Sequence, residues 1–339
     1  MAKDLLINKD GQASFGIFPG GVNNINYMDF DLRNAMDKRR GTLAKRLKFN
    51  QFQFIGFTSP ELIVGIAIVD LKIASNCFVY AYHPETEKFE EFSFIQPLAV
   101  KTDIALKPND GIARFEKNGN KVAITATATP RLRSVLVELK SGFKLDAVID
   151  ESANFDPLAV CTRAGYNGWV FTQKATALIC NGTVNWGKEQ YDLEKIDALA
   201  SVDWTAGYMR RETSWNWGSL SCKLPDGRRL GFNLAAGVNE TGFTENGLWL
   251  DGTLHKIDMV DFQFDRNHSS HAWAMRSNDG MINLHFEPAG QRKEKLNLII
   301  AASNFTQHFG RFYGDILING ETIHLNGVWG FTEDHYAKW

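Results

Sequence analysis

Short dipeptides of Asn or Asp followed by Gly recur along the whole chain and constrain its fold more than any other feature. Asn-Gly begins at positions 118, 167, 181, 246, 319 and 326, and Asp-Gly at 10, 110, 226, 251 and 279. Both dipeptides tolerate the positive φ angles that a two-residue hairpin turn requires. Apolar and polar residues alternate nearby, as in 52–57, 89–94 and 122–127, whereas helical periodicity is limited to 191–199 and 31–39. The sequence therefore predicts an all-β protein of antiparallel strands with few short helices.

Two of these dipeptides also predict a strand register. A two-residue turn at Asp226-Gly227 places Trp217 opposite Ala236 and Trp215 opposite Val238. The same rule at Asn319-Gly320 places Ile316 opposite Ile323 and Asp315 opposite His324. A slip of one residue would move every side chain to the other face of the strand, so these pairings are sharp tests.

The length and composition predict two globular domains. The chain has 339 residues, 24 Phe and 9 Trp, a mixture that excludes disorder and coiled coil. The alternating pattern breaks in the polar stretch 150–157, so we expect one β-barrel or sandwich in residues 1–160 and another in 161–339. No apolar run is long enough for a transmembrane segment, and a net charge of −2 gives no nucleic-acid footprint. The four cysteines are scattered and the N-terminus becomes polar too early for a signal peptide, which favours a cytoplasmic protein.

The segment 210–218 carries the strongest candidate for a binding site. On a strand, Arg211, Trp215 and Trp217 share one face, and Glu212 and Asn216 share the other. Two indoles and a guanidinium are suited to an apolar or unsaturated ligand, although the same tryptophans also suit a hydrophobic core. The amide of Asn233, in a strand that follows, is a candidate orienting contact for such a ligand or, equally, part of a turn.

Signatures of metal, nucleotide and nucleophile chemistry are missing from the sequence. His268 and His271 would point to opposite faces of a strand, so we expect no metal site. Gly-x-Ser-x-Gly, the Walker A pattern and the dinucleotide fingerprint do not occur, and we expect no cofactor. The basic run 38–48 is the one charged cluster that could contact RNA or anionic lipid, but a solvated edge explains it more simply in a chain of balanced charge.

Several motifs together resemble the family known as domain of unknown function 2804. They are the segment 166–175, Trp215-Asn216-Trp217, Gly231-Phe232-Asn233-Leu234, Glu245-Asn246 and the ending 327–335, which includes Trp329. That family is distantly similar to the AttH and carotenoid-hydratase group, whose relatives include tocopherol cyclase and lipocalin-like Diels–Alderases. The resemblance implies two calycin-type, lipocalin-like β-barrels packed together, with an apolar pocket in or between them. It supplies no catalytic residues.

These observations support three hypotheses for the function. The first is a protein that binds an apolar small molecule such as a lipid or isoprenoid through Arg211, Trp215, Asn216, Trp217, Asn233 and Trp329. The second is a cofactor-free hydratase, cyclase or isomerase, which needs an acid or base in the apolar cavity. The available groups are Glu212, Glu240, Glu245, Asp334 and His335, of which Glu212, Asp334 and His335 are the main catalytic candidates. The third is a scaffold whose exposed aromatic residues bind a partner chain.

Overall fold

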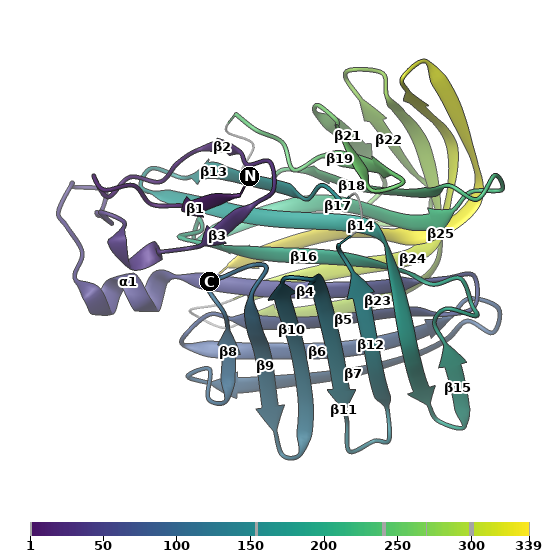
Figure 1. Ribbon diagram of the computed structural model, residues 1–339, viewed down its shortest axis with the longest axis horizontal. Coiled ribbons are helices and arrows are strands. Elements are labelled where there is room, and N and C mark those ends of the chain that lie inside the picture. Colours follow the sequence, from purple (N-terminus) through teal and green to yellow (C-terminus); the bar gives the residue numbers. More distant parts are fainter. Residues whose placement is uncertain (1, 153–154, 239–241, 269, 298–301, 339) are drawn as a thin grey trace.

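Most of the chain is folded into two curled antiparallel β-sheets that pack against each other. The computed structural model describes residues 2–152, 155–238, 242–268, 270–297 and 302–338. Within these residues the two sheets form half-barrels, which confirms the expected all-β, lipocalin-like class (Figure 1). Among the described residues, no helix is both long enough and apolar enough to cross a membrane.

The larger sheet comes from the N-terminal part of the chain, and its strand order is β7-β6-β5-β4-β16-β14-β12-β11-β10-β9-β8, with β13, β15 and β2 paired beside this path. Its strands are β2 (Gly16–Ile17), β4 (Asn50–Thr58), β5 (Ile63–Asp70), β6 (Ala74–His83), β7 (Lys88–Pro97), β8 (Thr102–Ile104), β9 (Gly111–Lys117), β10 (Asn120–Ala128), β11 (Arg131–Glu138), β12 (Lys144–Asp150), β13 (Leu158–Ala164), β14 (Gly168–Trp186), β15 (Glu189–Asp192) and β16 (Leu199–Gly207). The sheet curls so far that the side chain of Gln51 in β4 donates a hydrogen bond to the carbonyl oxygen of Ile104 in β8.

The second sheet follows in the chain and has the strand order β20-β19-β18-β17-β25-β24-β23-β22-β21. Its strands are β17 (Glu212–Lys223), β18 (Arg229–Ala236), β19 (Gly247–Leu250), β20 (Thr253–Lys256), β21 (Val260–Gln263), β22 (Trp273–Ser277), β23 (Ile282–Asn297), β24 (Ala302–Ile318) and β25 (Glu321–Lys338). The short parallel pair β1 (Lys3–Leu5) and β3 (Val22–Asn24), the 3-10 turn η1 (Tyr27–Asp29) and helix α1 (Thr42–Lys48) gather at the end of the molecule where β4 begins (Figure 1).

The hydrophobic core is divided by the sheets. One cluster fills the first half-barrel and includes Phe57, Trp169 and Trp204. Another fills the second half-barrel, around Phe312. A further cluster lies between the sheets and joins residues such as Phe54, Tyr80 and Tyr82 of the first sheet to Trp217, Phe309, Trp329 and Phe331 of the second. The contact between the half-barrels is therefore an aromatic core in its own right.

The chain passes from the first sheet to the second between Gly207 and Glu212. This change of sheet does not coincide with the expected division at 160/161, because that point falls within β13, which pairs with β14 along the whole length of β13. The polar stretch that suggested the division is a connection from β12 to β13 within the first sheet.

One predicted register is confirmed and the other is wrong by one residue. Asn319 and Gly320 form the expected two-residue turn, and Ile316 lies opposite Ile323. At the other hairpin, Trp217 lies opposite Ala235 rather than Ala236. The reason is that the loop has three residues, 225–227: the amide of Gly227 donates to the carbonyl of Leu224, and φ at this glycine is +89°.

Both predicted helices are wrong. Residues 191–199 are the end of β15, a turn and the start of β16, and residues 31–39 form turns closed by an isolated bridge between Arg33 and Arg39. The side chain of Asn34 accepts hydrogen bonds from the amides of Met36 and Lys38, which stabilises the turn over a helix. Helix α1 forms instead inside the basic run 38–48, which was expected to be an edge.

Candidate functional site

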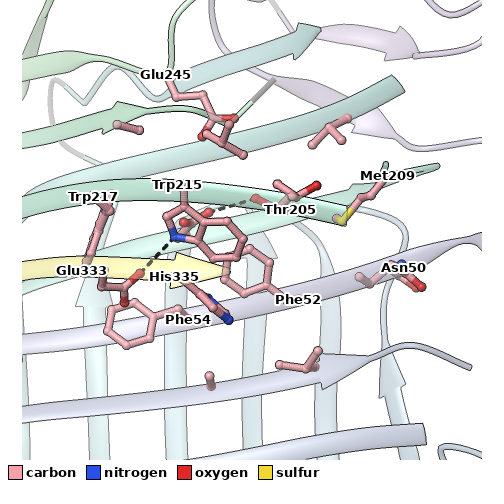
Figure 2. A pocket seen from close by; sticks show the side chains of 18 of the residues that line it. Asn50, Phe52, Phe54, Thr205, Met209, Trp215, Trp217, Glu245, Glu333 and His335 are labelled. Atoms are coloured by element: carbon pink, nitrogen blue, oxygen red, sulfur yellow. Dashed lines mark hydrogen bonds between the residues drawn. The ribbon is translucent and has the colours of Figure 1, made fainter. Parts of the chain in front are cut away.

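A cavity lies between the two sheets, at the end of the inter-sheet core. Its volume is about 170 Å³. The walls come from β4, β5, β6, β14 and β16 on one side and from β17, β18, β24 and β25 on the other, so neither half-barrel contains the cavity alone (Figure 2). The apolar lining consists of Phe52, Phe54, Ala67, Val69, Leu71, Phe78, Val170, Met209, Trp215, Trp217, Ala235, Val238 and Phe305.

Strand β25 contributes a carboxyl group to this cavity. Because side chains alternate along a strand, Glu333 and His335 face the cavity while Asp334 between them faces away. Glu333 accepts a hydrogen bond of 3.2 Å from the indole nitrogen of Trp215 and one of 2.6 Å from the amide of Gln307. Burial raises the pKa of this carboxyl to about 7, although both hydrogen bonds favour the ionised form. Near neutral pH, Glu333 can therefore both hold and release a proton.

His335 is a neutral imidazole at the same wall. Burial lowers its pKa to about 3, and the nearby guanidinium of Arg292 lowers it further in the same direction. Its ring lies 4.2 Å from the ring of Trp215 and 4.8 Å from that of Phe305, measured between centroids. Nε2 lies 3.1 Å from the hydroxyl oxygen of Ser303, and Nδ1 has no hydrogen-bond partner among the described residues.

A buried ion cluster borders the opposite side of the cavity. The ammonium group of Lys174 in β14 contacts a carboxylate oxygen of Asp203 in β16 and lies 3.4 Å from Glu245. Burial lowers the pKa of Lys174, but the two carboxylates outweigh burial and the net shift is upward. Asp203 also accepts a hydrogen bond of 3.1 Å from the hydroxyl of Thr205. This cluster is positioned to orient a polar group on a molecule that is otherwise apolar.

The indole of Trp217 is fixed by a chain of hydrogen bonds. Its nitrogen donates to the side-chain oxygen of Asn233 at 2.7 Å, and the Asn233 amide donates to the main-chain oxygen of Glu245 at 2.7 Å. The ring also meets Phe54 edge-on, with centroids 6.1 Å apart. Asn233 is buried behind the indole and acts as a positioning residue for it.

The structure brings only some of the sequence-predicted residues together. Trp215, Trp217 and His335 line the cavity, as does Glu245, and Asn233 supports Trp217.

The other predicted residues lie elsewhere. Asn216 and Asp334 meet on the opposite face of the sheet, where Asp334 also binds Arg266. Arg211 and Glu212 are exposed and outside the cavity lining, with Glu212 paired to Lys338. Trp329 packs between the sheets next to Tyr82. Glu240 lies outside the described residues.

The sequence reasoning missed Glu333, Lys174 and Asp203. Glu333 was within reach, since it stands two residues before His335 and therefore shares its face of the strand. Lys174 and Asp203 oppose each other in the pairing of β14 with β16, which no local pattern reveals.

The expectation for the histidine pair rested on a wrong element. His268 and His271 lie in a turn rather than a strand, and their rings stack with centroids 4.8 Å apart. Together with Asp265 they place potential metal-ligating atoms within 4.8 Å of one another on the exposed surface. This group lies outside the cavity lining.

Comparison with known proteins places the fold and the family. The structure of CghA with Sch210972 is 8% identical in sequence, covers 86% of this chain and 88% of its own, and gives a TM-score of 0.57. A putative AttH from Nitrosomonas europaea is 13% identical, with 85% and 92% covered and a TM-score of 0.49. Kievitone hydratase from Nectria haematococca is 8% identical, with 100% and 98% covered and a TM-score of 0.48.

Comparison by sequence gives a family but no curated relative. No curated protein matches the chain in sequence. The family model described as domain of unknown function, DUF2804, matches residues 1–339, and the chain therefore belongs to this family.

Proposed function

We propose that the protein binds an apolar small molecule in the inter-sheet cavity and uses Glu333 as an acid–base group on it. The observation that carries this proposal is a carboxyl group with a pKa of about 7 on the wall of an aromatic cavity. A pKa near the working pH is what a general acid or base requires. An ionised carboxylate in such a place costs stability, and strongly shifted pKa values are typical of functional sites.

The cavity size defines the part of the ligand that it encloses. A cavity of about 150 Å³ lined by apolar side chains holds a benzene-sized molecule, so this one accommodates a ring or a short branched chain of a larger lipid or isoprenoid-like molecule. CghA, whose fold is similar, was solved with the compound Sch210972, which supports small-molecule binding by this architecture.

The roles follow from the contacts. Trp215 and Trp217 would hold the apolar body between the sheets, and the cluster around Lys174 would bind a hydroxyl or carbonyl group. Glu333 would give a proton to a double bond or carbonyl, or take one from an adjacent carbon. His335, neutral at physiological pH, would accept a hydrogen bond and would not act as an acid. Hydration, proton-initiated cyclisation and double-bond migration in an apolar substrate all use such a proton transfer.

Mass spectrometry under mild conditions, followed by organic extraction, tests whether a ligand co-purifies. We expect a stoichiometric apolar molecule that Trp217→Ala releases. An empty protein that also fails to bind a panel of fatty acids and isoprenoids would reject the proposal in favour of a partner-binding scaffold.

A pair of variants then separates binding from catalysis. Glu333→Gln keeps the size of the side chain but cannot transfer a proton, so it should abolish turnover of the extracted molecule and keep its binding. Asp334→Asn is the matched control, because the neighbouring residue faces away from the cavity. Equal turnover by both variants would remove Glu333 as the acid–base group.

A further inference from the structure

One end of the molecule exposes apolar side chains among basic ones. The apolar side chains are Met36, Leu43, Leu47 and Tyr166, whose exposed fractions are 75%, 70%, 46% and 73%. Within residues 36–48, basic residues stand at 38–40, 45–46 and 48, and the one acidic residue is Asp37. We call these apolar residues, together with the basic residues of 38–48, the basic–apolar surface.

The parts of this surface are held together by specific contacts. Leu43 and Leu47 lie one turn apart on helix α1 and so share a face. Lys45 holds the helix in place by donating to the main-chain oxygen of Met28 at 2.7 Å. The turn that carries Met36 is joined to the turn that carries Tyr166, since the side chain of Asn167 donates to the main-chain oxygen of Asn34 at 2.7 Å.

The same surface lies beside the cavity. Residue Phe49, directly after α1, stacks on Tyr27 with centroids 3.8 Å apart and meets Tyr208 at 5.7 Å. The residues that directly follow Phe49 and Tyr208 in the sequence, Asn50 and Met209, line the cavity. Figure 1 shows α1 at the end of the molecule where β4 begins, and Figure 2 shows Asn50 and Met209 on the same side of the cavity.

We propose that the basic–apolar surface docks onto anionic lipid membranes and places the adjacent end of the cavity at the bilayer. Charge complementarity identifies this occupant: the chain as a whole carries a net charge of −2, yet its basic residues concentrate here around exposed leucine and methionine side chains. Apolar side chains that enter the acyl region, a tyrosine at the headgroup level and surrounding Lys and Arg are the features of interfacial binding. A solvated edge would not need the exposed leucines.

This inference extends the proposed function, because a ligand with low solubility in water is taken from a membrane most directly. The docking itself does not depend on any cavity ligand, so it is measured separately. The test is flotation of the purified full chain with phosphatidylcholine vesicles that contain either no anionic lipid or about one third phosphatidylglycerol. We expect binding to the anionic vesicles, and a loss of that binding in high salt.

The apolar half of the surface is tested by the double variant Leu43→Ser with Leu47→Ser. Both side chains are exposed, so the fold should persist, and affinity for anionic vesicles should fall by about tenfold or more because two buried leucine contacts are lost. The matched control replaces two other exposed leucines on sheet strands, Leu136 and Leu317, by serine. Equal losses in the two double variants would overturn the proposal.

The basic half is tested by replacing Lys38, Arg40 and Arg46 with glutamine. Each basic side chain near an anionic surface contributes about fivefold to binding, so affinity should fall more than tenfold. The control changes three exposed lysines on β10–β12 and the adjoining turn, Lys121, Lys140 and Lys144.

The outcomes separate docking from the proposed function. Absence of wild-type binding to anionic vesicles overturns the docking proposal, whereas the cavity ligand is still measured by extraction. Binding to single-stranded DNA that depends on the basic residues but not on Leu43 and Leu47, without vesicle binding, would assign the surface to nucleic acid instead. Normal vesicle binding by Trp217→Ala, with the ligand lost, is the expected sign that docking and cavity binding are separate.

Discussion

Glu333 couples the stability of the protein to pH. Its pKa is about 7 in the folded protein against an ordinary value of 4.5, so between these values the folded state holds the proton more firmly than the unfolded state. The free energy of unfolding therefore decreases, on account of this residue, as pH rises from about 4.5 to 7. From the size of the pKa difference, the decrease is at most roughly 3 kcal/mol.

Glu333→Gln should remove this dependence, so urea unfolding at pH 5 and pH 8 should show the variant gaining stability relative to the wild type at the higher pH. Parallel pH profiles for the two proteins would contradict the raised pKa.

His335 should have the opposite effect. Its pKa is lowered from 6.5 to about 3, so the unfolded state binds the proton more firmly between these values, and the free energy of unfolding rises as pH increases from about 3 to 6.5. His335→Asn removes this term. Thermal unfolding at pH 4.5 and pH 7 should show the variant gaining on the wild type at the lower pH, and a gain at the higher pH instead would be inconsistent with a buried neutral imidazole.

The sequence allowed residues of the candidate site to be predicted only where a single strand carries them. The segment around Trp215 and Trp217 predicted an aromatic pocket, and both side chains line the cavity. Strand alternation would also have led from His335 to Glu333. Lys174 could not be predicted, because it acquires its role only when β14 pairs with β16 and Glu245, in the connection between β18 and β19, lies against it.

At the scale of the element, the hairpin of β17 and β18 shows why a predicted strand register can be wrong by one residue. The rule for Asp-Gly assumed a two-residue loop, but the amide of Gly227 bonds to the carbonyl of Leu224 and the loop takes in Pro225 as well. The slip matters functionally, since Asn233 lies opposite Ser219 on the face that Trp217 shares. The Asn319-Gly320 hairpin obeyed the rule because both of its residues adopt positive φ.

The same hairpin supplies a stability test. Gly227 has φ of +89° with open space around it, so alanine there meets only the backbone penalty of the left-handed region. We expect Gly227→Ala to lower the free energy of unfolding by about 1 kcal/mol, measured by urea titration. A Gly227→Ala variant as stable as the wild type would show that the loop can adopt another turn.

At the scale of the molecule, turn chemistry predicted an all-β chain and the resemblance predicted two β-barrels packed together, which the structure shows as two half-barrels. The division of the chain between them could not be found from the sequence. Past the polar stretch, the first sheet continues with β13, β14 and β16. Their place in this sheet depends on long-range pairing, of β14 with β12 and of β16 with β4. The cavity depends on the same long-range strand pairing, because its walls come from both sheets.

The inter-sheet core should make the half-barrels unfold as one unit. Phe309 and Phe312 lie on β24 in different clusters: Phe309 packs on Tyr80 and Tyr82 of the first sheet, whereas Phe312 packs inside the second half-barrel on Phe232. Each change to alanine should cost about 3–5 kcal/mol. If the sheets are coupled, Phe312→Ala accelerates amide hydrogen exchange in β5 of the first sheet as much as in β22 of the second. Faster exchange confined to β22 would mean that the second half-barrel opens alone, and the cavity would then open with it.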